Sequence, residues 1–155
     1  MPPTVVNLDD ARAFARDLGE GWCTTTELVD MVAAARDRAI ALMPMDLTGT
    51  GITGTVLSGR ERDTIVYATG LPPFFTEHVI FHELSHLLCG HLEPAPDGSS
   101  ELFAARIDPE QEQEAELLAT ALAQVHWERR RTRAVGRVHD DGGLVATLAP
   151  HLLTR

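Results

Sequence analysis

Apolar residues recur at helical spacing near the start of the chain, and this pattern predicts two helices there. The first is expected over residues 8–18, with Asn7 as its N-cap. The second follows Thr24 and Glu27, which have the spacing of a capping box, and is expected to end near Arg38. Both helices therefore have a start signal that the residues themselves supply.

The middle of the chain changes to short apolar and β-branched runs separated by glycine and polar residues, which is typical of strands. Three strands are expected, over residues 40–45, 52–57 and 64–68. The short turns between them favour a small three-stranded antiparallel sheet. We expect the stretch 51–58 to lie at an edge of this sheet, where it can hold an extended substrate peptide by main-chain hydrogen bonds.

Two further helices are predicted after the sheet. Residues 74–91 read FFTEHVIFHELSHLLCGH, with Thr76 as the expected N-cap and Gly90 as the stop. The last helix begins at Asp108 and Pro109 and runs through residue 131, where three arginines suit its C-terminal end. These elements predict an α+β fold in one domain, residues 1–155, with a mobile loop over 92–107 and a C-terminal tail over 134–155 that docks on the body.

Composition narrows the classes of function. The formal net charge of −10 argues against direct binding of nucleic acid or of an anionic membrane. All 13 basic residues are arginine, which suggests a GC-rich bacterial genome. No signal peptide or membrane-spanning run is apparent, and the two cysteines, Cys23 and Cys89, are expected to be free thiols, so we expect a cytoplasmic protein.

The chemistry of the chain is concentrated in His82-Glu83-Leu84-Ser85-His86, an HExxH pattern. Residues four apart lie on one face of a helix, so His82 and His86 can direct two imidazoles at one metal ion. Glu83 lies beside the first ligand, where it can take a proton from a metal-bound water. The alternative is a helix with two ordinary histidines, and a third ligand is needed to decide between them.

Three sources of a third ligand remain open. His91 follows His86 by five residues, a spacing that fits known zinc motifs poorly. Glu114 is on the apolar stripe of the last helix, so its carboxylate is expected to face the core and to need a partner, whereas Glu112 and Glu116 are expected to face solvent. The third source is an acid of the loop, and nothing singles one out among Glu93, Asp97 and Glu101.

HELSHLLCGH followed by EQEAELLATALA resembles the ImmA/IrrE family of bacterial zinc metallo-endopeptidases, over about residues 25–125. The resemblance implies that His82, His86 and Glu114 bind Zn²⁺ and that Glu83 is the general base. Glu116 departs from the asparagine or aspartate usual at its position. The resemblance also implies site-specific cleavage of a helix-turn-helix repressor, which would regulate transcription of stress-response or mobile-element genes.

Other roles remain open for the chain and for single residues. The same fold can act as a non-proteolytic module that binds a repressor or antitoxin, or as a helical regulator without a metal. Tyr67 and His126 are candidate donors to an oxyanion, although a structural role is favoured for each. His78, one turn before His82, is expected on the solvent side or behind the metal ligand.

Overall fold

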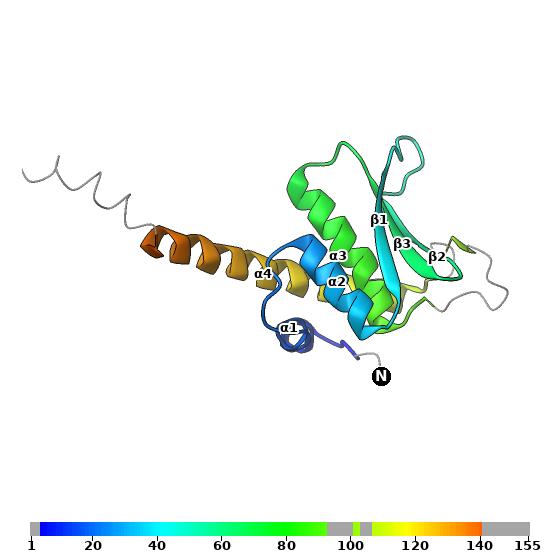
Figure 1. The fold of residues 1–155 in the computed structure, drawn as a ribbon. Coiled ribbons are helices and arrows are strands. Elements are labelled where there is room, and N and C mark those ends of the chain that lie inside the picture. Colours follow the sequence, from blue (N-terminus) through cyan, green and yellow to red (C-terminus); the bar gives the residue numbers. More distant parts are fainter. Residues whose placement is uncertain (1–3, 93–100, 103–106, 141–155) are drawn as a thin grey trace, which may run out of the picture.

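The computed structural model describes residues 4–92, 101–102 and 107–140 (Figure 1). Four helices and a small sheet make an α+β fold, as predicted. In chain order the elements are α1 (Leu8–Asp17), α2 (Thr25–Ala35), β1 (Ala39–Met45), β2 (Gly54–Ser58), β3 (Arg62–Ala68), α3 (Pro73–Cys89), β4 (Glu101–Leu102) and α4 (Pro109–Asp140).

The sheet is mixed, with strand order β1-β3-β2-β4, so the prediction of an antiparallel sheet was wrong. β2 and β3 form an antiparallel hairpin, but β1 runs parallel to β3. The reason lies in residues 46–53, which carry the chain past the end of β3 to its other side. A short connection shows that two strands are close along the chain, but it does not show that they are neighbours in the sheet.

β2 is an edge strand over part of its length. β4 pairs only with Leu57 and Ser58, in antiparallel register. Among the described residues, Gly54 to Val56 have no strand partner on the side away from β3. The predicted edge is therefore present, shortened at one end by β4.

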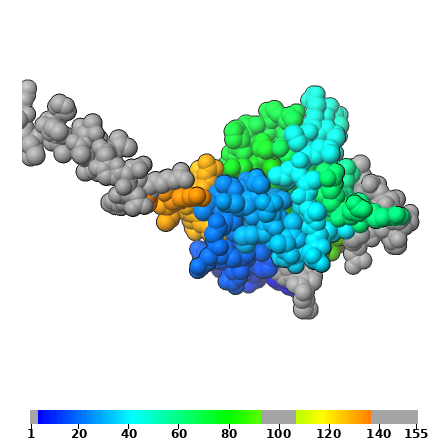
Figure 2. Space-filling model, in the orientation of Figure 1, coloured from blue at the N-terminus to red at the C-terminus, as the bar shows by residue number. Residues whose placement is uncertain are grey.

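The helices pack in layers on the sheet (Figure 1). α3 contacts β2 and β3, α4 lies against α3, and α1 lies against α4. The end of α4 extends beyond the rest of the fold (Figure 2). The largest fully buried apolar side chains come from every layer: Trp22, Leu28, Val32, Val56, Ile65, Phe81, Leu84, Leu87, Leu118 and Leu122.

The helix boundaries agree with most of the sequence signals. The side chain of Asn7 caps α1, and Thr24 and Glu27 form the predicted capping box. α3 begins at Pro73 with Pro72 as its N-cap, so Thr76 is not the cap as predicted, because proline at the first position already supplies a start. Gly90 ends α3 in the left-handed conformation, with φ of 72°.

α4 is longer than predicted, because it continues through residues 132–140. The first part of the expected tail over 134–155 is therefore helical, and residues 141–155 lie outside the described chain, as do 93–100 and 103–106 of the expected loop. Within the described residues, no helix is long and apolar enough to cross a membrane.

Asp63, at the start of β3, anchors a buried ion-pair cluster. Its side chain is 1% exposed and lies 3.1 Å from the Arg36 guanidinium and 3.0 Å from that of Arg38. The Ser58 hydroxyl donates to the same carboxylate at 2.7 Å. Arg36 also donates to the carbonyl of Leu87 in α3. The cluster joins the end of α2, the sheet and the last turn of α3.

Candidate metal centre

α3 places His82 and His86 on one face, one turn apart, with their Nε2 atoms 3.1 Å from each other. Leucine, isoleucine and phenylalanine residues bury the opposite faces of the helix and fix its rotation. The side chain of His86 is 2% exposed and that of His82 is 22% exposed. The two imidazoles predicted to share a metal are therefore adjacent, one buried and one at the rim.

The carboxylate that meets them belongs to Glu112. One Glu112 oxygen lies 3.2 Å from His82 Nε2 and the other lies 3.7 Å from His86 Nε2. The sequence pattern predicted Glu114 here and Glu112 toward solvent. In the structure Glu112 is 49% exposed, as expected, yet it is the carboxylate next to the two rings, and Glu114 contacts His91 instead. His82, His86 and Glu112 form a group whose ligand atoms are close enough to hold one metal ion.

Glu112 and Glu114 have different neighbours because they lie on different faces of α4. One face meets α1 and the N-terminal segment, where Gln124 accepts a hydrogen bond from Arg12 at 2.8 Å and Glu114 accepts one from the Val5 amide at 2.7 Å. The other face meets α3 and carries Glu112 and Glu116. The apolar stripe that singled out Glu114 is buried in the core that α4 shares with α1 and α3.

Glu114 lies in a second group with Cys89 and His91. His91 Nε2 is 2.9 Å from Glu114 Oε2, and His91 Nδ1 is 3.0 Å from His86 Nδ1. The thiol of Cys89 is free and buried, as expected, and burial, with the nearby negative charge of Glu114, raises its pKa to about 12. His91 therefore lies behind His86 and not beside its Nε2.

His82 has a different neighbour behind it. Its Nδ1 lies 3.1 Å from one oxygen of Glu116, and the other oxygen lies 3.0 Å from His78 Nε2. His78 thus contacts His82 through Glu116, on the half-exposed side of the site. The longer glutamate at this position reaches both histidines.

Glu83 lies between α3 and β2. Burial, with the nearby charge of Glu112, raises its pKa to about 8. Gly54 of β2 touches this side chain so closely that an added Cβ would lie 3.0 Å from Glu83 Oε1 and 2.5 Å from Val79. The absence of a side chain at Gly54 therefore allows the strand to approach the motif.

His86 is held as a neutral imidazole. Burial lowers its pKa to about 3, with further contributions from the neighbouring rings of His82 and His91. A neutral ring leaves one nitrogen with a free lone pair, which is the form that binds metal ions. Two imidazoles and one carboxylate, with Glu83 beside them, match the donor set of a catalytic zinc site.

The group opens into a cleft of about 290 Å³ between α3, the start of α4 and β2. Its described lining is Gly51, Ile52, Thr53, Gly54, Thr55, Val56, His82, Glu83, His86, Leu92, Ile107 and Glu112. Tyr67 and His126 are not among these residues; His126 is buried beside Trp22 and Phe81 instead. The side chains of Glu93, Asp97 and Glu101 lie outside the described residues.

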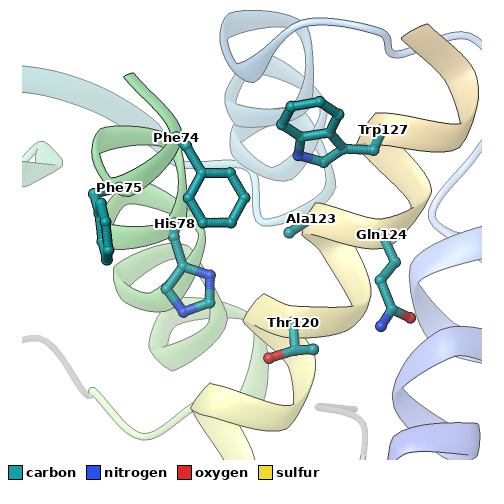
Figure 3. Close-up of a pocket in the computed structure, with 7 residues that line it drawn as sticks. All are labelled: Phe74, Phe75, His78, Thr120, Ala123, Gln124 and Trp127. Atoms are coloured by element: carbon teal, nitrogen blue, oxygen red, sulfur yellow. The ribbon is translucent and has the colours of Figure 1, made fainter. Parts of the chain in front are cut away.

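A larger pocket of about 490 Å³ lies between α3 and α4, on the other side of His78 (Figure 3). Phe74 and Trp127 project into it from the two helices, and both are about half exposed. It contains no carboxylate or cysteine among its described lining residues. Of these two pockets, only the smaller cleft has both histidines and carboxylates in its described lining.

Comparison of the chain with protein-family models, with curated proteins and with solved structures finds no match.

Proposed function

We propose that the protein is a zinc-dependent endopeptidase whose metal ligands are His82, His86 and Glu112. The observation that supports this most directly is the convergence of two imidazoles and one carboxylate beside a largely buried glutamate and an open strand edge. A structural zinc site has four protein ligands and needs no base, whereas this group has three and has Glu83 next to it.

The chemistry divides between the metal and the chain. A bound zinc ion supplies a Lewis acid and lowers the pKa of water to roughly 7. Glu83 is the group that accepts a proton from water and returns it to the leaving amine. Its low exposure keeps bulk water from competing for that proton, and a cation beside it favours its ionised form.

The open edge of β2 is suited to hold the substrate as an extended peptide. The Thr53 carbonyl accepts from Ala68, so residues 53, 55 and 57 direct their backbone groups to β3. Gly54 and Val56 then direct theirs to the other edge, along the cleft that contains Glu83. We therefore expect a peptide added beside β2 to pass the metal ligands.

The proposed substrate is a helix-turn-helix repressor, which follows from the resemblance to the ImmA/IrrE family. The sequence EQEAE carries two candidate ligands, and the geometry favours its first glutamate, Glu112, over Glu114. Glu116, the departure from the family pattern, takes a role behind His82. The resemblance is compatible with this assignment once the ligand moves by two residues.

The decisive experiment compares the wild type with Glu83→Gln and with Glu110→Gln, an exposed control on α4. Each is purified without an affinity tag, its zinc content is measured, and it is incubated with the helix-turn-helix protein encoded by the neighbouring gene. We expect equal zinc content and a fall in cleavage of about 100-fold or more for Glu83→Gln alone. Binding of that protein without cleavage by the wild type would instead support the non-proteolytic module.

A further inference from the structure

We propose that His91 and Glu114 are positioning residues that hold His86 in the one tautomer that can bind a metal through Nε2. The inference rests on the proposed metal centre but not on peptidase activity. It gives a role to two residues that the sequence left as candidate third ligands and that the structure places behind His86.

The three side chains form a continuous chain of contacts from the metal centre to the N-terminal segment. His86 Nδ1 lies 3.0 Å from His91 Nδ1, and His91 Nε2 lies 2.9 Å from Glu114 Oε2. The other oxygen of Glu114 accepts the Val5 amide at 2.7 Å. The side chain of His91 is 4% exposed, so water has little access to replace either of its contacts.

The order of donors along this chain follows from its carboxylate end. Glu114 as a carboxylate can only accept, so His91 must carry its hydrogen on Nε2. A neutral His91 then has a lone pair on Nδ1, and His86 must donate to it from its own Nδ1. His86 Nε2 is left without a hydrogen, facing His82 and Glu112. One carboxylate therefore fixes the tautomers of two histidines.

The same residues, with Cys89, could be regarded as a second metal site, because their ligand atoms are also close together. The contacts argue against that assignment. Both ring nitrogens of His91 are already in hydrogen-bond contact, one with His86 and one with Glu114. A second ion would have to break one of these contacts. On Nδ1 it would leave His86 Nδ1 without a partner in a buried place, and on Nε2 it would displace Glu114 and move the hydrogen of a neutral His91 to Nδ1, which reverses the tautomer of His86.

The test measures zinc affinity by competition with a chromophoric chelator, for the wild type, His91→Ala, Glu114→Ala and the exposed control Glu110→Ala. We expect His91→Ala and Glu114→Ala to bind zinc about 10–100-fold more weakly, as is usual when the partner of a ligating histidine is removed. Glu110→Ala should bind as the wild type does. His91→Gln keeps one acceptor and one donor, so it should recover part of the affinity.

A second measurement reports the tautomer directly and needs neither zinc nor substrate. Long-range ¹H–¹⁵N spectra of the metal-free protein should show His86 protonated on Nδ1 and His91 on Nε2. In Glu114→Ala, both preferences should weaken. Circular dichroism separates a folded variant from an unfolded one, and His91→Gln supplies the comparison where His91→Ala does not fold.

The outcomes separate this inference from the proposed function. Unchanged affinity and unchanged tautomers in folded Glu114→Ala would overturn the inference while leaving the metal centre intact. Two zinc ions per wild-type chain, falling to one in His91→Ala, would also overturn it. If the wild-type protein shows the expected tautomers of His86 and His91 but binds no zinc, the proposed function is contradicted and the hydrogen-bond chain is supported.

Discussion

Two polar clusters flank the second half of α3, and they differ in how their charges are balanced. In the cluster around Asp63, two arginines and a serine hydroxyl satisfy one carboxylate. In the metal centre, Glu83 and Glu112 lie near neutral His86. Among the described residues, no arginine forms an ion pair with either glutamate of that centre.

The difference indicates which cluster holds the fold together and which one is prepared for a ligand. A buried charge without a partner is unfavourable, and the raised pKa of Glu83 is the local expression of that cost. The Asp63 cluster is complete without anything added. Within the described part of the chain, no arginine balances the carboxylates of the candidate metal centre, and a divalent ion would supply positive charge there.

The largest effect on folding is expected from Asp63→Ala. The change leaves Arg36 and Arg38 without their shared carboxylate, and breaking a buried pair from one side typically destabilises by about 3–5 kcal/mol. Urea denaturation should show this loss, and the exposed neighbour Arg62→Ala serves as the control. A loss below about 1 kcal/mol would mean that the two clusters do not differ as described.

Glu112→Ala should have the opposite profile. We expect zinc affinity to fall by about 100-fold or more, because a ligand is lost rather than the partner of a ligand. The stability of the metal-free protein should hold or rise, since one of two neighbouring acids is removed. Chelator competition and urea denaturation of the same samples measure both. Glu112→Ala with wild-type zinc affinity would remove Glu112 from the ligand set.

Glu83→Gln should change how the stability of the metal-free protein depends on pH. Between pH 4.5, the ordinary value, and about pH 8, folded Glu83 keeps a proton that the unfolded chain releases, so wild-type stability falls as pH rises. The variant lacks this contribution, so its free energy of unfolding should rise relative to that of the wild type across this pH window. The difference should reach a few kcal/mol at most, because one unit of pKa shift corresponds to about 1.36 kcal/mol.

Thermal unfolding at pH 5 and pH 8 in the presence of a chelator measures the gain of Glu83→Gln. Both proteins contain His86, whose lowered pKa affects the two alike, so their difference isolates Glu83. If the difference in melting temperature between the two proteins is the same at pH 5 and pH 8, Glu83 is ionised in the metal-free site.

The smallest effect is expected from Glu116→Ala. Its side chain is 54% exposed, so water can take its place beside His82. We expect zinc affinity to fall by about threefold or less, compared with the 10–100-fold expected for His91→Ala. The same chelator titration compares the two. A larger loss of zinc affinity for Glu116→Ala than for His91→Ala would mean that the contact of Glu116 with His82 matters more than the contact of His91 with His86.

The sequence predicted those parts of the fold that depend on local spacing. The HExxH helix, the capping box at Thr24 and the stop at Gly90 involve residues within one or two turns, so their pattern is visible in the chain. The pairing of β1 with β3 is not local, because it depends on where residues 46–53 cross the sheet. The Asp63 cluster joins four segments in the same non-local way.

The candidate site was predictable up to the choice between two glutamates on α4. Helical phase separated Glu114 from Glu112 correctly, but the phase alone does not say which neighbour each face meets. Because α1 covers one face and α3 the other, an apolar stripe has two possible partners. The close approach at Gly54 was equally invisible, since only the packed structure shows that Val79 and Glu83 need that space.

Glu112 is in the first turn of α4, whereas the two histidines are in the second half of α3. A metal ion on all three would thus be a removable crosslink between two helices that residues 90–108 separate in the sequence. The melting temperature of the protein should therefore rise with free metal concentration. At a metal concentration of one hundred times the dissociation constant, binding adds about 2.7 kcal/mol to the free energy of unfolding. Melting curves across a series of divalent ions would then rank the metals before any substrate is known.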